Sequence, residues 1–262
     1  MHTDDVLRQT ASEGPRIAVG QPFGFSNVLV GVDGGPGGRD AIRLAEILRD
    51  PRGQLMLAHV VITQSAVSRS LSSTTAWKAC REMLARERDL VGVGAALTGT
   101  ASSSVGRGLH QLADDWGADL LVVGSSRRGW VGRALRGDDA RAALSGAPCA
   151  VAVAPAGYLD RPRPVEIIGL GYDGTNESKA ATAAARTLAA RYGASVRVGL
   201  RSEGLRTLGN EVNLLILGSC RRGALRRLLR ASTSARLARS SCCAVLSLSR
   251  TDEHAQGRKP WS

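Results

Sequence analysis

Aromatic side chains and lysines are scarce in this chain of 262 residues. Aromatic residues make up 3% of the sequence, and only three of its 35 cations are lysines. No aromatic residue lies among the arginines between positions 221 and 239, which disfavours the base stacking that binds single-stranded nucleic acids. The net charge of +12 permits an anionic ligand or partner without selecting one. Nucleic acid is therefore not the partner we expect.

Long apolar runs and metal-ligand spacings are also missing. No apolar run approaches the roughly 20 residues of a membrane-spanning helix, so we expect no membrane segment. The first ten residues (MHTDDVLRQT) lack the basic and apolar regions of a signal peptide, which predicts a cytoplasmic protein. The cysteines show no metal-ligand pattern and are interpreted as small buried hydrophobic residues. They are Cys80, Cys149, Cys220, Cys242 and Cys243.

Two segments 94 positions apart carry the same module. Residues 120–153 form an apolar run closed by Gly124, a glycine turn, a basic stretch with helical spacing and a second apolar run. Residues 214–218 (LLILG) repeat residues 120–124 (LLVVG). The match continues without a gap until Cys243 falls on Cys149. An ungapped match of this length indicates an internal duplication.

Apolar runs alternate with helical spacings before and within this module. Strands are predicted at 27–32, 55–62, 94–99, 120–123 and 150–153, and helices at 39–49, 75–90, 106–116 and 127–145. This alternation predicts an α/β fold with a parallel, doubly wound, Rossmann-like sheet in strand order 3-2-1-4-5. Ligands of such sheets bind beyond the carboxyl ends of the strands, where the winding reverses.

The second copy is shorter than the first. Strands are predicted at 166–171 and 195–200, with a helix at 177–192 between them. Asp33 precedes Gly124 by 91 positions, whereas Asp173 precedes Gly218 by 45, which is 46 fewer. That difference is about one helix, one strand and their loops. The second copy should therefore keep strands 2-1-4-5 and expose an edge at its strand 2.

These patterns predict two tandem domains of the same fold class. We expect a flexible arm at 1–26, a first domain at 27–156, a linker at 157–164, a shortened second domain at 165–249 and a disordered tail at 250–262.

Together the motifs resemble the universal stress protein family in its tandem form. The resemblance rests on NVLVGVDGG, ADLLVVGSSRRG and APCAVAVAP in the first copy, and on EIIGLGYDGT, NLLILGSCRRG and CCAVLSL in the second. It implies a regulatory role in stress adaptation without catalytic residues, and ATP with Mg²⁺ as a possible ligand. It also implies pairing through the last strand, either as an intramolecular pseudo-dimer or as a homodimer.

ATP-binding members of that family carry Gly, two residues, Gly, nine residues, Gly and then Ser or Thr. An Asp after strand 1 contacts the adenosine, and the backbone of strand 2 reads the adenine. On this frame both copies keep the adenosine side and lose part of the phosphate side. The first copy supplies Asp33, Val60, Gly124, Ser125, Arg127, Gly137 and Asp138, and the second supplies Asp173, Gly218, Ser219 and Ser232.

Several alternatives stay open at this point. Asp33 and Asp173 could simply cap the helices that follow them. The glycines at 34–38 are not followed by Gly-Lys-Ser/Thr, so they do not form the P-loop of nucleotide hydrolases. An alternative function is a nucleotide-free interaction module that binds a protein partner through its last strands or its arginine-rich helix.

A pair of substitutions tests the phosphate side of the first site. Asp138 stands where the frame has a hydroxyl, and two unit charges 4 Å apart interact by about 4 kcal/mol at an effective dielectric constant of 20. If Arg127 contacts phosphate, Arg127→Gly should weaken ATP binding, measured by calorimetry. If Arg127 and Asp138 instead close the site, Arg127→Gly with Asp138→Ser should create binding. Unchanged affinity in both variants would refute both roles.

Overall fold

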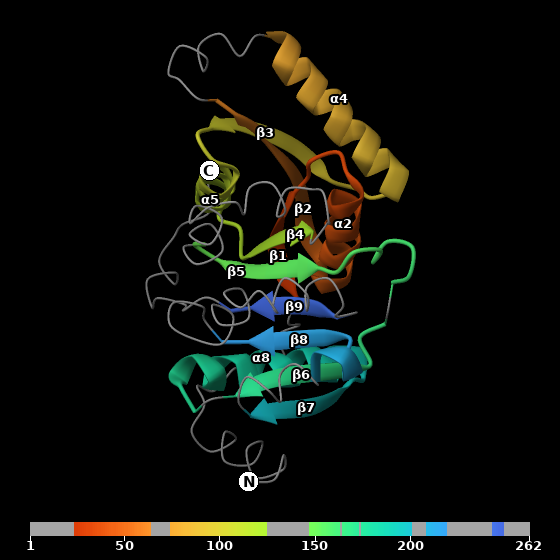
Figure 1. Ribbon diagram of the computed structural model, residues 1–262, viewed down its shortest axis with the longest axis vertical. Coiled ribbons are helices and arrows are strands. Elements are labelled where there is room, and N and C mark those ends of the chain that lie inside the picture. The colour runs from red at the N-terminus through yellow and green to blue at the C-terminus, as the bar shows by residue number, and fades with distance from the viewer. Residues whose placement is uncertain are drawn as a thin grey trace.

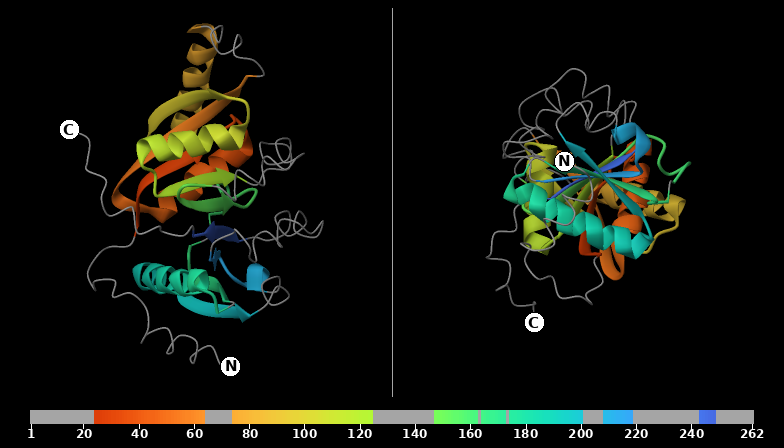
Figure 2. Two further views of the ribbon diagram at one scale, coloured as in Figure 1. Left: turned by 90° about the vertical axis from the view of Figure 1, so that its left-hand side faces the viewer. Right: turned by 90° about the horizontal axis from the view of Figure 1, so that it is seen from below.

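The computed structural model describes residues 24–63, 74–124, 147–162, 164–172, 174–200, 208–218 and 243–248. These residues form one nine-stranded sheet in the order β3-β2-β1-β4-β5-β9-β8-β6-β7 (Figure 1). The sheet is strongly twisted, and its strands fan out when it is seen from below (Figure 2).

The first half of the sheet is wholly parallel and has the strand order 3-2-1-4-5, which confirms the predicted fold class. Its core strands are buried on both faces, as in other parallel sheets covered by helices. Its elements are β1 (Phe25–Gly31), α2 (Pro36–Leu48), β2 (Arg49–Ile62), α4 (Thr74–Val91), β3 (Ala96–Ser102), α5 (Val105–Trp116), β4 (Leu120–Gly124) and β5 (Ala150–Ala154).

Three predicted boundaries in this half need correction. Strand β1 begins at Phe25, so Phe25 and Ser26 belong to the sheet and not to the predicted N-terminal arm. Phe25 is buried and pairs with Arg49, which also extends β2 six residues before its predicted start. Strand β3 lies at the edge of the sheet, where its residues are partly exposed. An edge strand has a weak apolar pattern, and the predicted range 94–99 therefore missed its second half.

The second half of the sheet has the order β9-β8-β6-β7, which corresponds to strands 5-4-1-2 of the first half. The expected arrangement 2-1-4-5 is therefore observed, with β7 at the end of the sheet. Its strands are parallel to one another. Its elements are β6 (Ile167–Tyr172), α8 (Asn176–Tyr192), β7 (Ser195–Leu200), β8 (Leu214–Leu217) and β9 (Ala244–Ser247).

The two halves join through antiparallel pairing of β5 with β9, whose arrows point in opposite directions in Figure 1. Val151 pairs with Ser247 and Val153 with Val245. Strand β5 also pairs with β4, and β9 also pairs with β8. Both edges of both last strands are thus occupied within the chain. This corrects the expectation that the last strands offer an edge to a protein partner.

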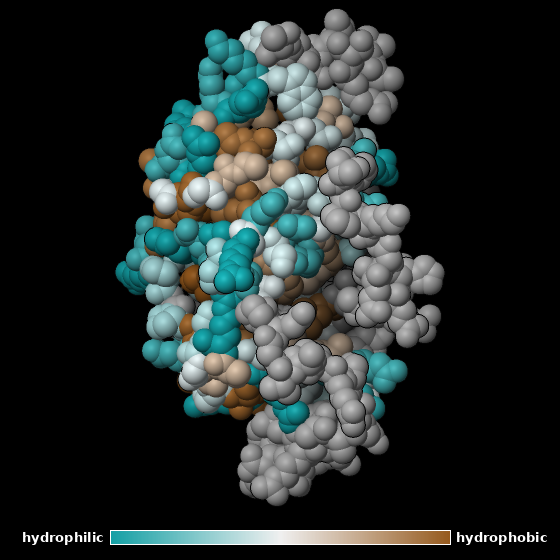
Figure 3. Space-filling model, turned by 180° about the vertical axis from the view of Figure 1, so that it is seen from behind, coloured by the Kyte–Doolittle hydropathy of each residue, from teal (hydrophilic) through white to brown (hydrophobic). Residues whose placement is uncertain are grey.

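Helices of both halves cover the same face of the sheet. Residues of α2, α4 and α8 belong to one continuous buried cluster, whereas α5 packs on the opposite face. The ends of α2 and α8 meet on the shared face. There the Tyr192 hydroxyl donates to the carbonyl of Ile47, and the Arg191 guanidinium donates to the carbonyl of Arg49 at 2.8 Å. The outer side of α4 is hydrophilic, as the upper left of Figure 3 shows.

A side-chain clamp at the start of the first strand recurs in the second half. The Asp119 carboxylate accepts from the backbone N–H groups of Ser26 at 2.7 Å and Asn27 at 3.0 Å. Asn213, 94 positions later, accepts from the N–H groups of residues 166 and 167 at 3.1 and 2.9 Å. The two halves therefore repeat one local contact at equivalent positions of the sequence.

The predicted linker packs on helix α2. The buried carboxylate of Asp40 accepts from the N–H groups of Gly157 at 2.9 Å and Leu159 at 2.8 Å, and Tyr158 between them is buried. The segment after β5 is thereby fixed to the first half. The domain boundaries themselves stay a prediction, and the predicted tail at 250–262 lies outside the described residues. Among the described helices, none combines the length and apolar character that crossing a membrane requires.

Asp40→Asn should destabilise the protein by about 1–3 kcal/mol, because the amide can accept one of the two N–H groups but leaves the other facing its own NH₂. Burial raises the pKa of Asp40, although its bonds from Leu159 and Gly157 oppose the shift. The folded chain therefore holds this proton more tightly than the unfolded chain. The contribution of Asp40 is full below its unfolded pKa of about 3.9 and is lost as pH rises through the folded pKa.

Urea unfolding at pH 4.5 and pH 7 checks both points. The difference in unfolding free energy between the native protein and Asp40→Asn should be smaller at pH 7 than at pH 4.5, because ionisation of the buried Asp40 carboxyl destabilises only the native protein. Asp50→Asn is the matched control, because Asp50 accepts one exposed N–H from Arg52. Equal effects of the two substitutions would contradict the anchoring role of Asp40.

Candidate functional site

The structure brings together the three described residues that the sequence predicts for the first site. Strand β1 pairs with β2 through Gly31 and Ala58, which puts Asp33 level with Val60. It pairs with β4 through Val30 and Val122, which puts Gly124 level with the residue before Asp33. The three residues therefore lie at the carboxyl ends of neighbouring strands. The winding reverses between β1 and β4, which is where doubly wound sheets bind ligands.

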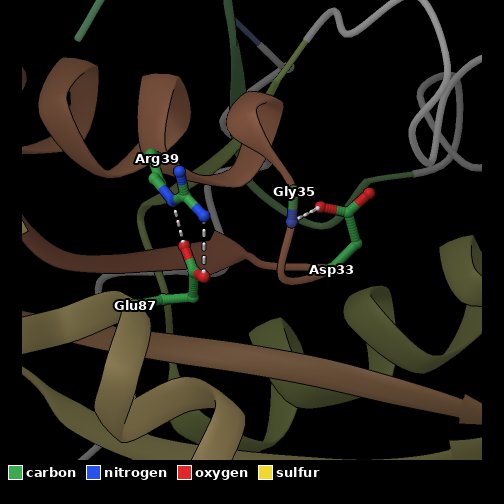
Figure 4. Close-up of polar contacts among 4 residues, drawn as sticks. All are labelled: Asp33, Gly35, Arg39 and Glu87. Atoms are coloured by element: carbon green, nitrogen blue, oxygen red, sulfur yellow. Dashed lines mark hydrogen bonds and ion pairs between the residues drawn. The ribbon is translucent and has the colours of Figure 1, made fainter. Parts of the chain in front are cut away.

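Asp33 closes a tight turn between β1 and α2. One carboxylate oxygen accepts from the N–H of Gly35 at 2.9 Å (Figure 4). Gly34 adopts a left-handed φ of 79°, which favours glycine, and the side chain of Met83 lies against it. Gly35 is the N-cap of α2. Because it has no side chain, it makes no side-chain capping bond to the first turn of the helix. Asp33 therefore shapes the entry to α2 as an Asx turn, which differs from the N-cap proposed from sequence.

Gly124 is a glycine for a packing reason. A Cβ atom at this position would lie 2.0 Å from the carbonyl oxygen of Gly37 in the first turn of α2. Only a glycine lets β4 and α2 approach this closely. The residue type at 124 is therefore explained without a ligand. The same close approach brings the end of β4 against the start of α2, beside the turn that Asp33 closes.

Strand β2 extends past the end of β1 and offers backbone groups there. The N–H of Val32 donates to the carbonyl of Ala58 at 2.8 Å, so Ala58 faces β1. Backbone groups of a parallel strand alternate in direction, so Val60 faces the same side, just beyond β1. The Val60 side chain is buried against the α5 side of the sheet. What Val60 can present at the site is therefore its backbone.

His59 helps to hold together the ends of β1 and β2, next to Asp33 and Val60. Its Nδ1 lies 2.7 Å from the carbonyl oxygen of Val32. A carbonyl only accepts, so the proton of this bond is on Nδ1. The ring thereby ties β2 to the residue immediately before Asp33. His59 is a positioning residue here, since its bond goes to the backbone of the turn.

An ion pair that the sequence analysis missed holds α4 against α2 next to the site. Arg39 donates to both carboxylate oxygens of Glu87, at 2.7 and 3.3 Å (Figure 4). The Glu87 side chain is 3% exposed and that of Arg39 is 32% exposed. The hydrogen bond to Glu87 raises the pKa of Arg39, which therefore stays charged. Glu87 follows Cys80 and Leu84 on the buried stripe of α4, and a carboxylate on such a stripe is a usable signal.

The remaining predicted site residues divide into two groups. Gly218 follows β8 directly, as Gly124 ends β4. Ser125, Arg127, Gly137, Asp138, Asp173, Ser219 and Ser232 lie outside the described residues. Within the described part of the chain, no group of three or more His, Cys, Asp or Glu residues is arranged to hold a metal ion.

The parallel winding and the corner formed by Asp33, Val60 and Gly124 define a doubly wound α/β protein of the Rossmann-like class. The model of the universal stress protein family matches residues 24–155. The chain belongs to the universal stress protein family. No curated protein matches the sequence.

Two solved structures of similar fold span most of the chain, and a third match spans about half of it. A universal stress protein from Archaeoglobus fulgidus DSM 4304 is 12% identical with a TM-score of 0.60, covering 87% of this chain and 97% of its own. A functionally unknown protein from Pseudomonas aeruginosa PAO1 is 15% identical with a TM-score of 0.53, covering 86% and 92%. A universal stress protein in complex with cAMP is 21% identical with a TM-score of 0.38, covering 51% and 99%.

The ion pair beside the site predicts unequal effects of removing its two members. Arg39→Ala should cost about 3 kcal/mol, because it leaves the buried Glu87 carboxylate without its cation. Glu87→Gln should cost about 1 kcal/mol, since the partly exposed Arg39 can be hydrated. Urea unfolding measures both. Arg43→Ala is the control, because its pair with Glu46 is more exposed and contributes less than about 1 kcal/mol. A larger loss for Glu87→Gln than for Arg39→Ala would contradict this.

Proposed function

We propose that this protein acts in stress adaptation as a regulatory, non-catalytic protein, and that its first half binds ATP at the carboxyl ends of β1, β2 and β4. The observation that supports this proposal is the juxtaposition of the partly exposed Asp33 carboxylate with the backbone of Val60 at the point where the winding reverses. We further propose a cytoplasmic location.

The groups at this corner suit the adenosine part of a nucleotide. A carboxylate accepts hydrogen bonds from ribose hydroxyls, and a strand backbone offers the paired donor and acceptor that an adenine edge requires. Asp33 would therefore hold the ribose and Val60 the base. We assign the phosphates to Gly124, Ser125, Arg127 and Gly137. A bound Mg²⁺ would neutralise part of the phosphate charge and so reduce the repulsion from Asp138.

We propose the second half as the weaker nucleotide site. It would use Asp173, Gly218, Ser219 and Ser232. Arg221 and Ala231 replace two glycines of the frame, so phosphate would meet side chains where the family motif has bare backbone. ATP binding to the first half would then be the main determinant of the proposed regulatory response.

Calorimetric titration of ATP and Mg²⁺ into the full chain tests the proposal. We expect binding that Asp33→Ala weakens about tenfold or more, because a hydrogen bond to a charged group contributes about 1.5–3 kcal/mol. Asp33→Asn is the matched variant, since its amide oxygen can still accept from Gly35 and preserve the turn. Asp173→Ala should leave the stronger binding step unchanged.

The variants separate a ligand role from a structural one. If Asp33 acts only through its turn, Asp33→Asn should bind ATP as tightly as the native protein. The absence of binding heat and of a thermal shift at millimolar ATP would reject the nucleotide site altogether. Turnover of ATP by the native protein would reject the non-catalytic role.

A further inference from the structure

Strands β1 and β2 stop pairing where the candidate site begins. Their pairing ends at Gly31 and Ala58, and the last backbone bond runs from the N–H of Val32 to the carbonyl of Ala58 at 2.8 Å. In a parallel ladder the next bond would run from the N–H of Val60 to the carbonyl of Val32. No such bond joins these two described residues. The ladder therefore ends one bond before it would reach Val60.

The Val32 carbonyl is bound by a side chain instead. Nδ1 of His59 lies 2.7 Å from this oxygen and donates to it. The N–H of Thr63 donates to the carbonyl of Ser102 on β3 at 3.0 Å, so the alternation of β2 directs the backbone of Val60 to the opposite side, toward β1. The N–H of Val60 thus faces the β1 side, where the carbonyl that would pair with it already holds His59.

Two blocks of pairs show which positions of the two halves correspond. Residues 27–31 of β1 pair with residues 54–58 of β2, and residues 167–171 of β6 pair with residues 195–199 of β7. Both blocks begin at the residue whose N–H is bound by the side-chain clamp at the start of each half. The residues that directly follow these blocks can therefore be compared with one another.

The second half continues its ladder by one further pair. Tyr172 of β6 pairs with Leu200 of β7, whereas the equivalent residues Val32 and His59 do not pair. A leucine side chain has no hydrogen-bond donor, so it cannot compete for the carbonyl of the neighbouring strand. The half with the shorter ladder is therefore the half in which the side chain at this position donates to that carbonyl.

The unpaired end of the ladder is suited to a ligand with its own acceptor. Val60 is 3% exposed, and a buried backbone N–H without a partner is unfavourable. An acceptor atom of a ligand placed beyond β1 would supply the missing bond. The carbonyl of Val60 faces the same side and can accept from the same ligand.

We propose that His59 keeps the candidate site open by holding the Val32 carbonyl, which stops β1 from pairing with Val60 and leaves the N–H of Val60 for the ligand. His59 is thus a positioning residue that acts through the backbone of Val60, and only the identity of the ligand rests on the proposed function. Adenine offers an acceptor ring nitrogen beside a donor amino group, which matches this N–H and C=O. Hypoxanthine offers a ring N–H beside a carbonyl, which is the reverse pattern.

Amide hydrogen exchange of the full chain without ATP, followed by NMR, tests the backbone part. His59→Phe keeps a ring but removes the donor, which frees the Val32 carbonyl to accept from Val60. The Val60 amide should then exchange at least about tenfold more slowly than in the native protein, because a new hydrogen bond has to open first. The Ala58 amide is the internal reference. Equal exchange of Val60 in the two proteins would overturn the proposal.

Calorimetric titration with ATP and with inosine triphosphate tests the ligand part. The native chain should prefer ATP, and His59→Phe should weaken ATP binding at least about tenfold and reduce that preference. His59→Asn is the matched variant, since its amide nitrogen can donate from the place of Nδ1, and it should bind ATP nearly as the native chain does. Loss of the ring alone would damage the asparagine variant more than the phenylalanine variant.

Two further results would overturn the role of His59. One is native ATP affinity in His59→Phe, and the other is an equal loss of affinity in His59→Asn. If His59→Phe does not fold, His59→Leu takes its place, because leucine stands at the equivalent position of the second half. A native chain that binds no ATP would reject the proposed function, while the exchange comparison would still decide whether His59 keeps Val60 unpaired.

Discussion

The antiparallel pairing of β5 with β9 is the contact on which the rest of the architecture depends. It turns two parallel sheets into one and gives both last strands neighbours on each side. An antiparallel pair relates its two strands by a twofold rotation about an axis perpendicular to the sheet, and such a rotation does not exchange the two faces. The equivalent helices α2 and α8 therefore lie on the same face. A single apolar cluster can then run under the helices of both halves, so neither half has to complete its core alone.

Helix α2 links this architecture to the candidate site. Its first turn packs against the end of β4 and follows the turn closed by Asp33. Its middle binds α4 through Arg39 and the segment after β5 through Asp40. Its last residues meet α8. A ligand that altered the entry to α2 would therefore act on an element that contacts both halves.

The buried elements were predicted well because their residues are almost all apolar, which gives a clear pattern in the sequence. The strands at the centre of the sheet were predicted at nearly their observed positions, and Asp33, Val60 and Gly124 of the predicted site lie at the ends of neighbouring strands. The edge strand β3 and the start of β1 were misplaced, since edge residues are half exposed and alternate weakly. The Arg39–Glu87 pair and the anchoring by Asp40 went unpredicted, because a sequence without structure does not show which charged residues face each other.

Gly124 shows how one residue can satisfy two explanations. The family motif assigns it to phosphate binding, while the structure requires a glycine there for packing against Gly37. A matching glycine is therefore weak support for a ligand at this position. The proposed ligand role therefore depends on Asp33 and Val60, whose carboxylate and backbone groups the strand register places level with each other.

The clamp at the start of the first strand of each half has diverged in a way that matters for acid–base behaviour. Asp119 and Asn213 accept equivalent backbone bonds, but only the aspartate can gain or lose a proton. Partial removal of solvent around the Asp119 carboxylate raises its pKa, so this anchor favours folding most at low pH and less as pH rises through the folded pKa. The asparagine anchor is indifferent to protons. The first half thus has an anchor that can titrate and the second half has one that cannot, so the two halves need not respond alike to acid.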